Sequence, residues 1–577
     1  MNPLKIKKIT VLLDQNHTWL SKLLSRAGYR YGNPCQNLLE NLNIFKNRDF
    51  CESMKLQSNL IPEIRNILKG KKFKFYGSEW FSNSELNELV NQRVIERYSH
   101  PYFFHRIVRK IIGVEKIRPV WSCPSELRKL YETIDGKTFS CISTILWWNL
   151  ASHIYLESML KNLKMLVKLF IIKSASTRST DVPDAYWFGF SLSELNLNSS
   201  KKDLSILHFI QDESISCLKN SKFIFIQTKT KNPILIQKSE KSVLIAKDCT
   251  QFIDKTQINR IDRISGTLGI LMNFIWFTKA YFCMEWWNLL LLQEVSALLI
   301  FRFWIRSAKP KHILFSSLPG LVPIWTKMDL FQRNGLLSWG IFYSTNNQVL
   351  EYERELQNAE FPVYHIMLND RFAVWNDFQK KWLNSLGYSN DKIEICGPIV
   401  FGKTNFKKHN KSEKGRQLFI FSIFDVIPYS EMFRLSIGSG ELYYSFAYVQ
   451  KFYEDILLSL QTQCREVDFK IWIKSKRSPL KLHNNAYWEY LKIFSKKAHP
   501  HANFFKPEFN PIEIIANSDA VISFPFTSTS FIAEKFQIPN SFYDPSGKLF
   551  NKVKGKSTPD FLNCEAALDL WIKKIIT

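Results

Sequence analysis

A run of small hydroxyl residues between positions 523 and 530 reads Ser-Phe-Pro-Phe-Thr-Ser-Thr-Ser. An apolar segment precedes it and a helical pattern follows it, which predicts a strand, a turn at Pro525 and a helix. The N-terminus of a helix offers backbone N–H groups and a positive dipole end, so it can bind phosphate. A single Ser or Thr suffices for a plain helix cap, which is the alternative. Four in succession favour a phosphate site formed by Ser523, Thr527, Ser528, Thr529 and Ser530.

A second group of candidate ligand-binding residues is basic. Lys474, Lys476 and Arg477 lie at and beyond the end of a strand-like segment, 469–473. Three cations at a strand end can bind a diphosphate or an acidic sugar, although a basic surface loop is the alternative. Nearby, segment 505–519 reads as a loop and a short helix, and such helix starts often meet a nucleotide base or ribose. Glu508 is the candidate there.

Two earlier segments, 312–320 and 338–347, each contain a short apolar strand that ends in polar residues. Because ligands of open parallel sheets bind beyond the carboxyl ends of the strands, we expect these loops to line the acceptor side of a cleft. Ordinary loop chemistry is the competing interpretation. The residues concerned are Ser316, Ser317, Tyr343, Ser344, Thr345 and Asn346.

Carboxylates near strand ends can act as general bases, and the first part of the chain offers candidates. Three candidates stand near predicted strand ends. Asp14 follows an opening strand predicted over Ile9–Leu13, Glu79 follows the strand-like segment 72–76, and the third is Asp329. Each is also a plausible cap or turn residue, so the residues alone do not choose among them.

The elements that position these residues are short strands alternating with helices, which predict parallel α/β sheets with right-handed crossovers. A chain of 577 residues is too long for one core, so two domains are expected. We place the N-terminal, acceptor-side domain at 1–395, the C-terminal domain at 396–545, and a final helix that crosses back at 546–577. The predicted strands are 392–400, 417–426, 469–478 and 539–545, the predicted helices are 369–386 and about 561–575, and 520–536 is predicted as strand, turn and helix.

Composition narrows the class of protein without naming a partner. The net charge of +26 comes from 78 Lys and Arg against 52 Asp and Glu, which favours an anionic partner. A compositional bias of the coding sequence explains the same charge equally well. The ten Cys are scattered without metal-ligand spacing, so we expect neither a metal site nor a disulfide framework, and reduced thiols in a cytoplasmic protein.

Two segments raise the question of membrane contact. Segment 267–305 is apolar but interrupted by Lys279, Glu285 and Glu294, which predicts two buried helices rather than a membrane span. Segment 156–173 has Lys at helical spacing opposite a Leu-rich stripe, the pattern of a basic helix that can lie on an anionic membrane. A solvated helix face is the alternative. The hypothesis is a cytoplasmic protein, peripheral on the inner face of the cytoplasmic membrane.

Residues 310–545 resemble GT-B glycosyltransferases of bacterial surface polysaccharide (capsule and O-antigen) biosynthesis. The resemblance rests on IWIKSKRS, NSDAVISFPFTSTSFIAEKF and IPNSFYDP, and on GPIVFG (397–402) as an interdomain linker. It implies a GT-B fold, in which two Rossmann-like domains face a cleft with parallel sheets and the N-terminal domain carries helical insertions. Relatives have His-Pro after the strand Lys. Here Ser475, Lys476 and Arg477 stand there, so cations would take the phosphate-binding role.

The resemblance implies transfer of a sugar from a CMP- or UDP-linked donor to a surface glycan or a lipid-linked acceptor. It further implies an inverting reaction that requires no metal and no other cofactor, because helix dipoles and basic side chains stabilise the leaving nucleotide. Two alternatives stay open. One is an alditol-phosphate transferase like the teichoic-acid polymerases, and the other is a nucleic-acid-binding or non-catalytic scaffold protein. No RNA-recognition, zinc-finger or helix-turn-helix signature is present, so nucleic acid is not expected as a partner.

Overall fold

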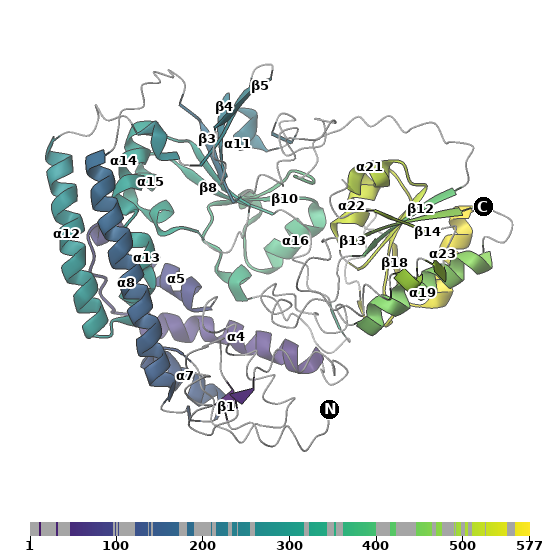
Figure 1. Cartoon of the computed structure of the whole chain (residues 1–577), viewed down its shortest axis with the longest axis horizontal. Helices are drawn as coiled ribbons and strands as arrows, with labels where there is room; N and C mark the ends of the chain where they lie inside the picture. The colour runs from purple at the N-terminus through teal and green to yellow at the C-terminus, as the bar shows by residue number, and fades with distance from the viewer. Residues whose placement is uncertain are drawn as a thin grey trace. The chain divides into compact units, whose positions relative to one another are not determined.

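Figure 1 shows the computed structural model of the chain. The chain divides into two units, with unit 1 comprising Met1–Gly32, Leu56–Tyr343 and Pro362–Gly402, and unit 2 comprising Asn33–Lys55, Ser344–Phe361 and Lys403–Thr577. The described residues are 11–12, 31–32, 47–95, 99, 102, 122–136, 138–139, 142–171, 182–189, 209–210, 215–228, 233–238, 241–247, 249–253, 260–316, 322–342, 351–352, 362–399, 416–422, 446–463, 469–475, 490, 492–494, 496–497, 502–505, 511–525, 527–547, 549–550 and 560–576.

Unit 1 contains an eight-stranded sheet with the order β11-β10-β8-β7-β3-β4-β6-β5. All neighbours are parallel except β5 and β6. The chain starts the sheet at β3, builds outward through β4 to β6, and then returns to lay β7 on the other side of β3. The bounds are β3 Ala185–Phe188, β4 Phe223–Gln227, β5 Ile234–Lys238, β6 Lys241–Ala246, β7 His312–Phe315, β8 Leu337–Ile341, β10 Arg371–Val374 and β11 Ile393–Ile395.

Unit 2 repeats this winding in a six-stranded, fully parallel sheet with the order β14-β13-β12-β15-β16-β18. Numbered from its first strand the order is 3-2-1-4-5-6, the order of doubly wound nucleotide-binding folds. The α/β prediction of two Rossmann-like domains is therefore confirmed by the topology of both sheets. The bounds are β12 Arg416–Ser422, β13 Phe469–Ser475, β14 Ala502–Phe505, β15 Ala520–Ser523, β16 Asn540–Tyr543 and β18 Asp560–Leu562.

Alternating side chains of the unit 1 strands enter two different cores, as the period of a strand requires. Trp187 and Ala185 of β3 face one core, whereas Tyr186 between them faces a large layer of helices. Several of these helices precede β3 or lie between β6 and β7, so the predicted helical insertions are present. The helices are α4 Asn47–Leu68, α5 Asn83–Val94, α7 Ser125–Asp135, α8 Ile142–Ile171, α12 Arg260–Phe282, α13 Trp286–Val295 and α14 Leu298–Ala308.

The apolar segment 267–305 forms parts of α12, α13 and α14, rather than two buried helices. Helices α13 and α14 are largely buried, but α12 exposes a row of apolar side chains. Among the described residues, no single helix has both the length and the apolar content needed to cross a membrane. Helices α13 and α14 pass that test only together, and they are bent by 48° where they meet.

Segment 72–76, which the sequence predicted as strand-like, is not a strand. Its backbone binds helix side chains instead of a neighbouring strand. The Lys74 N–H donates to Asn288 Oδ1 at 3.3 Å, the Tyr76 N–H donates to Asn273 Oδ1 at 2.7 Å, and the Lys72 carbonyl accepts from Trp287 Nε1 at 3.1 Å. Asparagines on α12 and α13 therefore satisfy backbone groups that a sheet would otherwise pair.

The structure corrects one further predicted helix and bears out the predicted opening strand. The helix predicted over 369–386 begins as strand β10 and becomes helix only at α16, Asp377–Ser385, because Phe372 and Val374 are buried in the sheet. The opening strand predicted over Ile9–Leu13 is confirmed at its described residues as β1, Val11–Leu12, which pairs with β2, Tyr31–Gly32, in a separate sheet. Strand β18 precedes the final helix and was not predicted.

The final helix, α23 (Glu565–Ile576), packs against α19 (Phe446–Gln463) within unit 2 (Figure 1). Lys451 of α19 forms an ion pair with Glu565, and Ser459 donates a hydrogen bond to Asp569. The sequence placed this helix in a segment that crosses back to the first domain. In the structure, its buried Leu568 and Ile572 complete the packing of unit 2.

Candidate functional site

The strand register of unit 2 brings two of the predicted groups to one edge of the sheet. Phe421 of β12 is paired with Lys474 of β13 on one side and with Ser523 of β15 on the other. The backbones of Lys474 and Ser523 are therefore level and separated by two strand spacings, about 10 Å. This edge is the carboxyl edge, and the strand order reverses between β12 and β15. Ligands of doubly wound sheets bind at such a switch point.

The hydroxyl residues after β15 form a buried network. Thr529 Oγ1 lies 2.9 Å from both Ser523 Oγ and Thr527 Oγ1, and Thr527 Oγ1 donates to the Phe524 carbonyl at 3.0 Å. The hydroxyl of Ser530 donates to the Ser541 carbonyl on β16 at 3.1 Å. These hydrogen bonds attach the turn and the start of α22 (Ser528–Lys535) to the end of the sheet.

Ser528 differs from its neighbours because it is only partly buried, whereas Thr527, Thr529 and Ser530 are buried. Thr527 is the N-cap residue of α22, yet its side chain makes no capping hydrogen bond and bonds Phe524 instead. Simple capping by Thr527 therefore does not explain this cluster. The arrangement holds the first turn of α22 rigidly at the switch point, where its N–H groups and the Ser528 hydroxyl can meet an anion.

Glu534 is a further titratable group on α22 that sequence reasoning missed. Burial raises the pKa of its carboxyl group to about 7, so its charge changes near neutral pH. Glu534 lies one turn beyond Ser530 on the helix. A single Glu in a short helix normally indicates a solvated face, so nothing in the sequence distinguished it.

The switch point of unit 1 lies between β3 and β7 and is built differently. The Ser316 N–H and hydroxyl both donate to the Phe188 carbonyl, at 3.2 and 3.3 Å, which joins the ends of the two strands. Phe188 and Phe315, the last residues of these strands, stack with their ring centroids 5.7 Å apart, and Trp325 meets Phe188 edge-on at 5.8 Å. Among the residues that the structure describes at this edge, aromatic rings predominate beside the Ser316 hydroxyl.

A buried ion pair holds the chain that follows β7. Arg93 of α5 binds Glu294 of α13 through two N–H···O contacts of 2.9 and 3.0 Å, and only 4 % of the Arg93 side chain is exposed. Arg93 also donates to the Val322 carbonyl at 2.8 Å, and Glu294 accepts from the Ile324 N–H at 3.0 Å. Glu294, whose charge argued against a membrane span, therefore helps to fix the backbone at Val322 and Ile324.

Two of the three candidate bases lie near one arginine. The Arg302 guanidinium stacks 4.0 Å above the Trp80 ring, and burial lowers its pKa while the charges of Asp329 and Glu79 oppose that shift. Asp329 opens α15 (Asp329–Arg333) and pairs with Arg333 at 2.9 Å, whereas Glu79 is exposed in a short 3-10 turn. Both stay predictions as bases, and Asp14 lies outside the described residues.

Several other predicted site residues cannot be placed. Lys474 is the second-last residue of β13, but only its backbone is described. The residues that lie outside the described part of the chain are Ser317, Tyr343, Ser344, Thr345, Asn346, Lys476, Arg477 and Glu508. Their assignment to the nucleotide or the acceptor stays a prediction.

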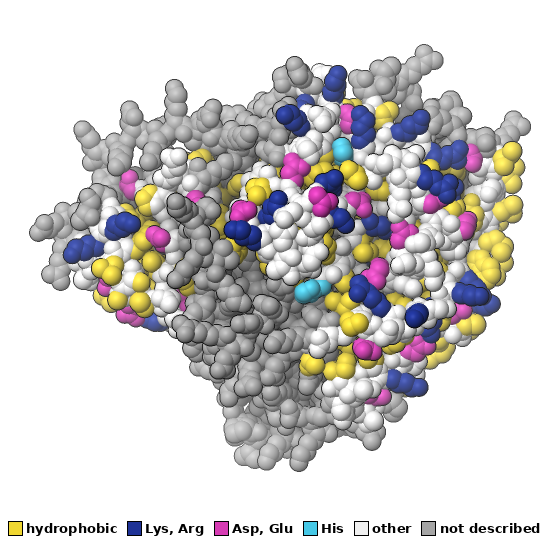
Figure 2. Space-filling view, turned by 180° about the vertical axis from the view of Figure 1, so that it is seen from behind, with side chains coloured by type: hydrophobic (Ala, Val, Ile, Leu, Met, Phe, Trp, Pro, Cys, Tyr) yellow, Lys and Arg dark blue, Asp and Glu magenta, His cyan; other side chains and the backbone are white. Residues whose placement is uncertain are grey.

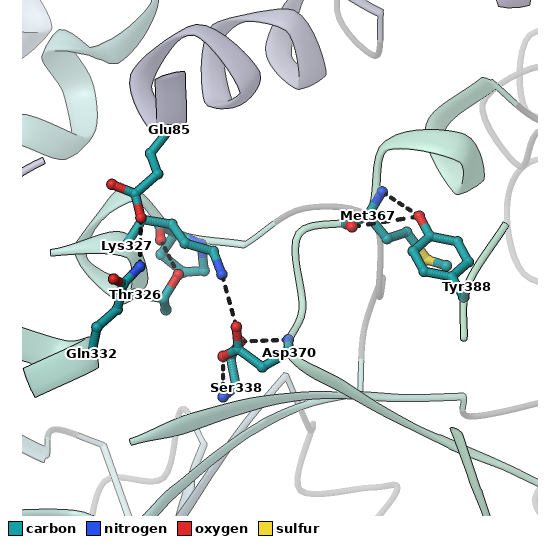
Figure 3. Close-up of polar contacts among 9 residues, drawn as sticks. Glu85, Thr326, Lys327, Gln332, Ser338, Met367, Asp370 and Tyr388 are labelled. Atoms are coloured by element: carbon teal, nitrogen blue, oxygen red, sulfur yellow. Dashed lines mark hydrogen bonds and ion pairs between the residues drawn. The ribbon is translucent and has the colours of Figure 1, made fainter. Parts of the chain in front are cut away.

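A third polar cluster has the residue types of an active site but lies at the opposite edge of the unit 1 sheet (Figure 3). Lys327, only 9 % exposed, contacts Asp370 at 3.3 Å, and the same carboxylate accepts hydrogen bonds from the Ser338 N–H and hydroxyl. Ser338 and Asp370 stand where β8 and β10 begin. Because ligands bind at the carboxyl edge, we interpret this cluster as structural.

The family model of polysaccharide biosynthesis PFTS motif proteins matches residues 271–572, more than half of the 577-residue chain. The chain belongs to this family. The four letters of the family's motif occur here as the sequence Pro525-Phe526-Thr527-Ser528, of which Thr527 is the N-cap and Ser528 the first residue of α22 at the switch point of unit 2. The resemblance to proteins of polysaccharide biosynthesis is thereby confirmed, and the motif coincides with the hydroxyl cluster singled out from the sequence.

Comparison with curated protein sequences finds no match. Among solved structures, the chain is similar to the lipopolysaccharide outer core galactosyltransferase WaaB in its apo form, at 11 % identity and TM-score 0.35, covering 68 % of this chain and 90 % of that one. Sucrose-phosphate synthase from Thermosynechococcus elongatus is 10 % identical at a TM-score of 0.36, and the match covers 68 % of this chain and 89 % of that one. A glycosyltransferase from Rickettsia africae ESF-5 is 12 % identical at a TM-score of 0.35, and the match covers 68 % of this chain and 88 % of that one. Likeness at this level carries no argument about activity.

Proposed function

We propose that this protein is a glycosyltransferase that moves a sugar from a nucleotide-activated donor to a growing surface glycan or a lipid-linked acceptor. One observation supports the proposal above all others. The motif of a polysaccharide-biosynthesis family, Pro525–Ser528, lies at the switch point of a six-stranded sheet with the strand order of nucleotide-binding folds. The proposed donor is CMP- or UDP-linked.

Transfer requires that the leaving nucleotide diphosphate or monophosphate be stabilised as negative charge develops on it. The N-terminus of α22 supplies oriented N–H groups and the positive end of the helix dipole for this purpose. The Ser528 hydroxyl adds a donor, and the basic residues at the end of β13, Lys474, Lys476 and Arg477, add positive charge. With these groups the reaction requires no metal, and we propose that it inverts the anomeric centre.

The acceptor hydroxyl must also lose a proton to a base. The candidates are Asp14, Glu79 and Asp329, and the acceptor would approach the carboxyl edge of unit 1 near Ser316. Asn or Gln substitution at the true base should lower kcat by roughly 100-fold or more, while the other two substitutions leave kcat near its original value. In this proposal the acceptor belongs to an O-antigen or a capsule, and the protein acts at the inner face of the cytoplasmic membrane.

A thermal-shift screen with CMP, UDP, GDP, CDP and their sugars tests the proposal, because a ligand that binds only the native state raises its Tm. We expect one nucleotide class to raise Tm, and Ser528→Ala to reduce that shift. The matched control is Ser84→Ala, an exposed serine in the first turn of α5, which should leave the shift unchanged.

Two results would contradict the proposal. The first is a folded protein that none of these nucleotides or nucleotide sugars stabilises. The second is selective stabilisation by a CDP-linked alditol, which would assign the site to alditol-phosphate transfer instead.

A further inference from the structure

Helices α8 and α12 lie side by side in unit 1 and run antiparallel (Figure 1). Three polar contacts set their register. Asn162 Nδ2 donates to the Ile270 carbonyl at 2.8 Å, Tyr155 and Thr278 share a hydrogen bond of 3.0 Å, and Ser152 and Tyr281 share one of 2.7 Å. Residue numbers therefore rise along α8 as they fall along α12, with a constant offset.

This register brings exposed apolar side chains of the two helices to nearly the same levels, within about two residues. The three level pairs are Leu163 with Leu268, Leu160 with Leu271, and Leu156 with Ile275, and these six side chains are 44–59 % exposed. Within each helix they recur every three or four residues, so each set occupies one face. Figure 2 shows hydrophobic side chains gathered along the edge of unit 1 that these helices form.

The exposed apolar side chains of α8 and α12 form one long surface. On α8 alone, exposed apolar side chains extend from Trp148 to Val167, about 28 Å along the helix. Contiguous apolar surface of this kind is rare on proteins that have no partner for it.

The charges around this surface are mainly positive. Together the two helices contain six Lys or Arg and two Asp or Glu. Both acids are engaged in ion pairs, Glu157 with Lys161 at 2.8 Å and Asp262 with Arg306 of α14 at 3.2 Å. Lys164, Arg263 and Lys279 are exposed.

We propose that the α8–α12 surface docks on an anionic lipid bilayer, with both helices parallel to the membrane plane. Apolar side chains would enter the interface while flanking lysines and arginines reach the phosphate headgroups. The charge favours lipid over a second copy of this chain, because two identical surfaces would bring like charges together. This inference is independent of the proposed sugar transfer, since it concerns only these helices.

Flotation of the purified full-length protein with vesicles tests the proposal. We expect binding to phosphatidylcholine vesicles that contain phosphatidylglycerol, and much weaker binding to pure phosphatidylcholine or in high salt. The double substitution Leu163→Gln/Leu268→Gln should weaken binding at least tenfold. The matched control is Leu458→Gln/Leu570→Gln, which makes the same change at two equally exposed leucines of unit 2 and should not alter binding.

Two double lysine variants test the electrostatic contribution to vesicle binding. Lys164→Gln/Lys279→Gln should weaken binding to anionic vesicles roughly tenfold or more, whereas Lys496→Gln/Lys497→Gln removes the same charge from unit 2 and should not. The proposal is wrong if folded protein fails to float with anionic vesicles, or if the α8–α12 variants float like their controls. A concentration-dependent dimer abolished by Leu163→Gln/Leu268→Gln would assign the surface to a second copy and overturn it as well.

Discussion

The switch points of the two units share a topology but not a chemistry. In unit 2 the strand next to the reversal ends in Ser523 and continues into a hydroxyl network and a helix start. In unit 1 the corresponding strand ends in Phe315 and Ser316, beside stacked and edge-on aromatic rings. The difference teaches that strand order decides where a ligand binds, whereas the residues after the strands decide which ligand binds.

The two edges also differ in how their loops are held. In unit 2, a hydrogen bond between the hydroxyl groups of Thr527 and Thr529 holds the start of α22. In unit 1, the buried Arg93–Glu294 pair binds the backbone at Val322 and Ile324. An aromatic edge suits a sugar ring or an apolar chain, and a hydroxyl-rich helix start suits phosphate. The predictions below test this contrast, from the largest expected effect to the smallest.

Removal of the ion pair in unit 1 should have the largest effect. Glu294→Ala leaves the Arg93 charge buried without its partner, so we expect the free energy of unfolding to fall by about 3 kcal/mol. Urea unfolding followed by tryptophan fluorescence measures the change. Replacement of both partners by methionine should cost less than Glu294→Ala alone, and a double variant as unstable as the single one would contradict this explanation.

In unit 2, Thr529→Val replaces a buried hydroxyl that bonds two others, with almost no change in shape. We expect a loss of about 2 kcal/mol, because Ser523 and Thr527 lose a buried partner. The comparison variant is Ser528→Ala, which should leave the urea midpoint nearly unchanged and act on nucleotide binding instead. Equal destabilisation by both variants would show that the network has no special role.

The raised pKa of Glu534 makes the stability of unit 2 depend on pH. The folded-state value of about 7 exceeds the usual value of 4.5, so the native state holds the proton more tightly. This stabilisation is complete below about pH 4.5 and disappears as pH rises through 7. Glu534→Gln should therefore be more stable than the wild type at pH 8, by about 1 kcal/mol after allowance for its half-exposed position, and the advantage should vanish at pH 4.5. Urea unfolding at these two pH values measures it.

The exposed ion pair between Asp329 and Arg333 in unit 1 should contribute least to the stability of the protein. Asp329→Asn removes the contact with Arg333, whose side chain is 76 % exposed, and we expect a loss of less than 1 kcal/mol. Thermal unfolding measures this, with Asp377→Asn as control because Asp377 forms an equivalent exposed pair with Lys381. A loss well above that of the control would mean that Asp329 acts on Arg302 rather than on Arg333.

Four of the six strands in the large sheet of unit 2 could be predicted from the sequence, because β12, β13, β15 and β16 come from short apolar runs bounded by polar residues, whereas β14 and β18 were not predicted. The strand, turn and helix of 520–536 are such a case, and the structure confirms them. Segment 72–76 was mistaken for a strand because Asn273 and Asn288, far away in the chain, satisfy its backbone. Strand β10 was mistaken for helix because four apolar-rich residues fit either period.

The position of the candidate phosphate site could be predicted, but not which of its hydroxyl groups hold the turn in place. Four successive hydroxyl residues suggested four ligands, whereas three of them are buried in contacts that depend on β16 and on the turn. The raised pKa of Glu534 and the anchoring role of Glu294 depend on tertiary burial, which no local pattern records.

The most direct test of the central claim is calorimetric titration of the wild-type protein and of Ser528→Ala with the nucleotide that gives the largest thermal shift. If the phosphate binds at the start of α22, the Kd should rise roughly tenfold in Ser528→Ala, which corresponds to the loss of one hydrogen bond to a charged group. The Kd of Ser84→Ala should equal that of the wild type. An unchanged Kd in Ser528→Ala would contradict the assignment of the nucleotide to the switch point of unit 2.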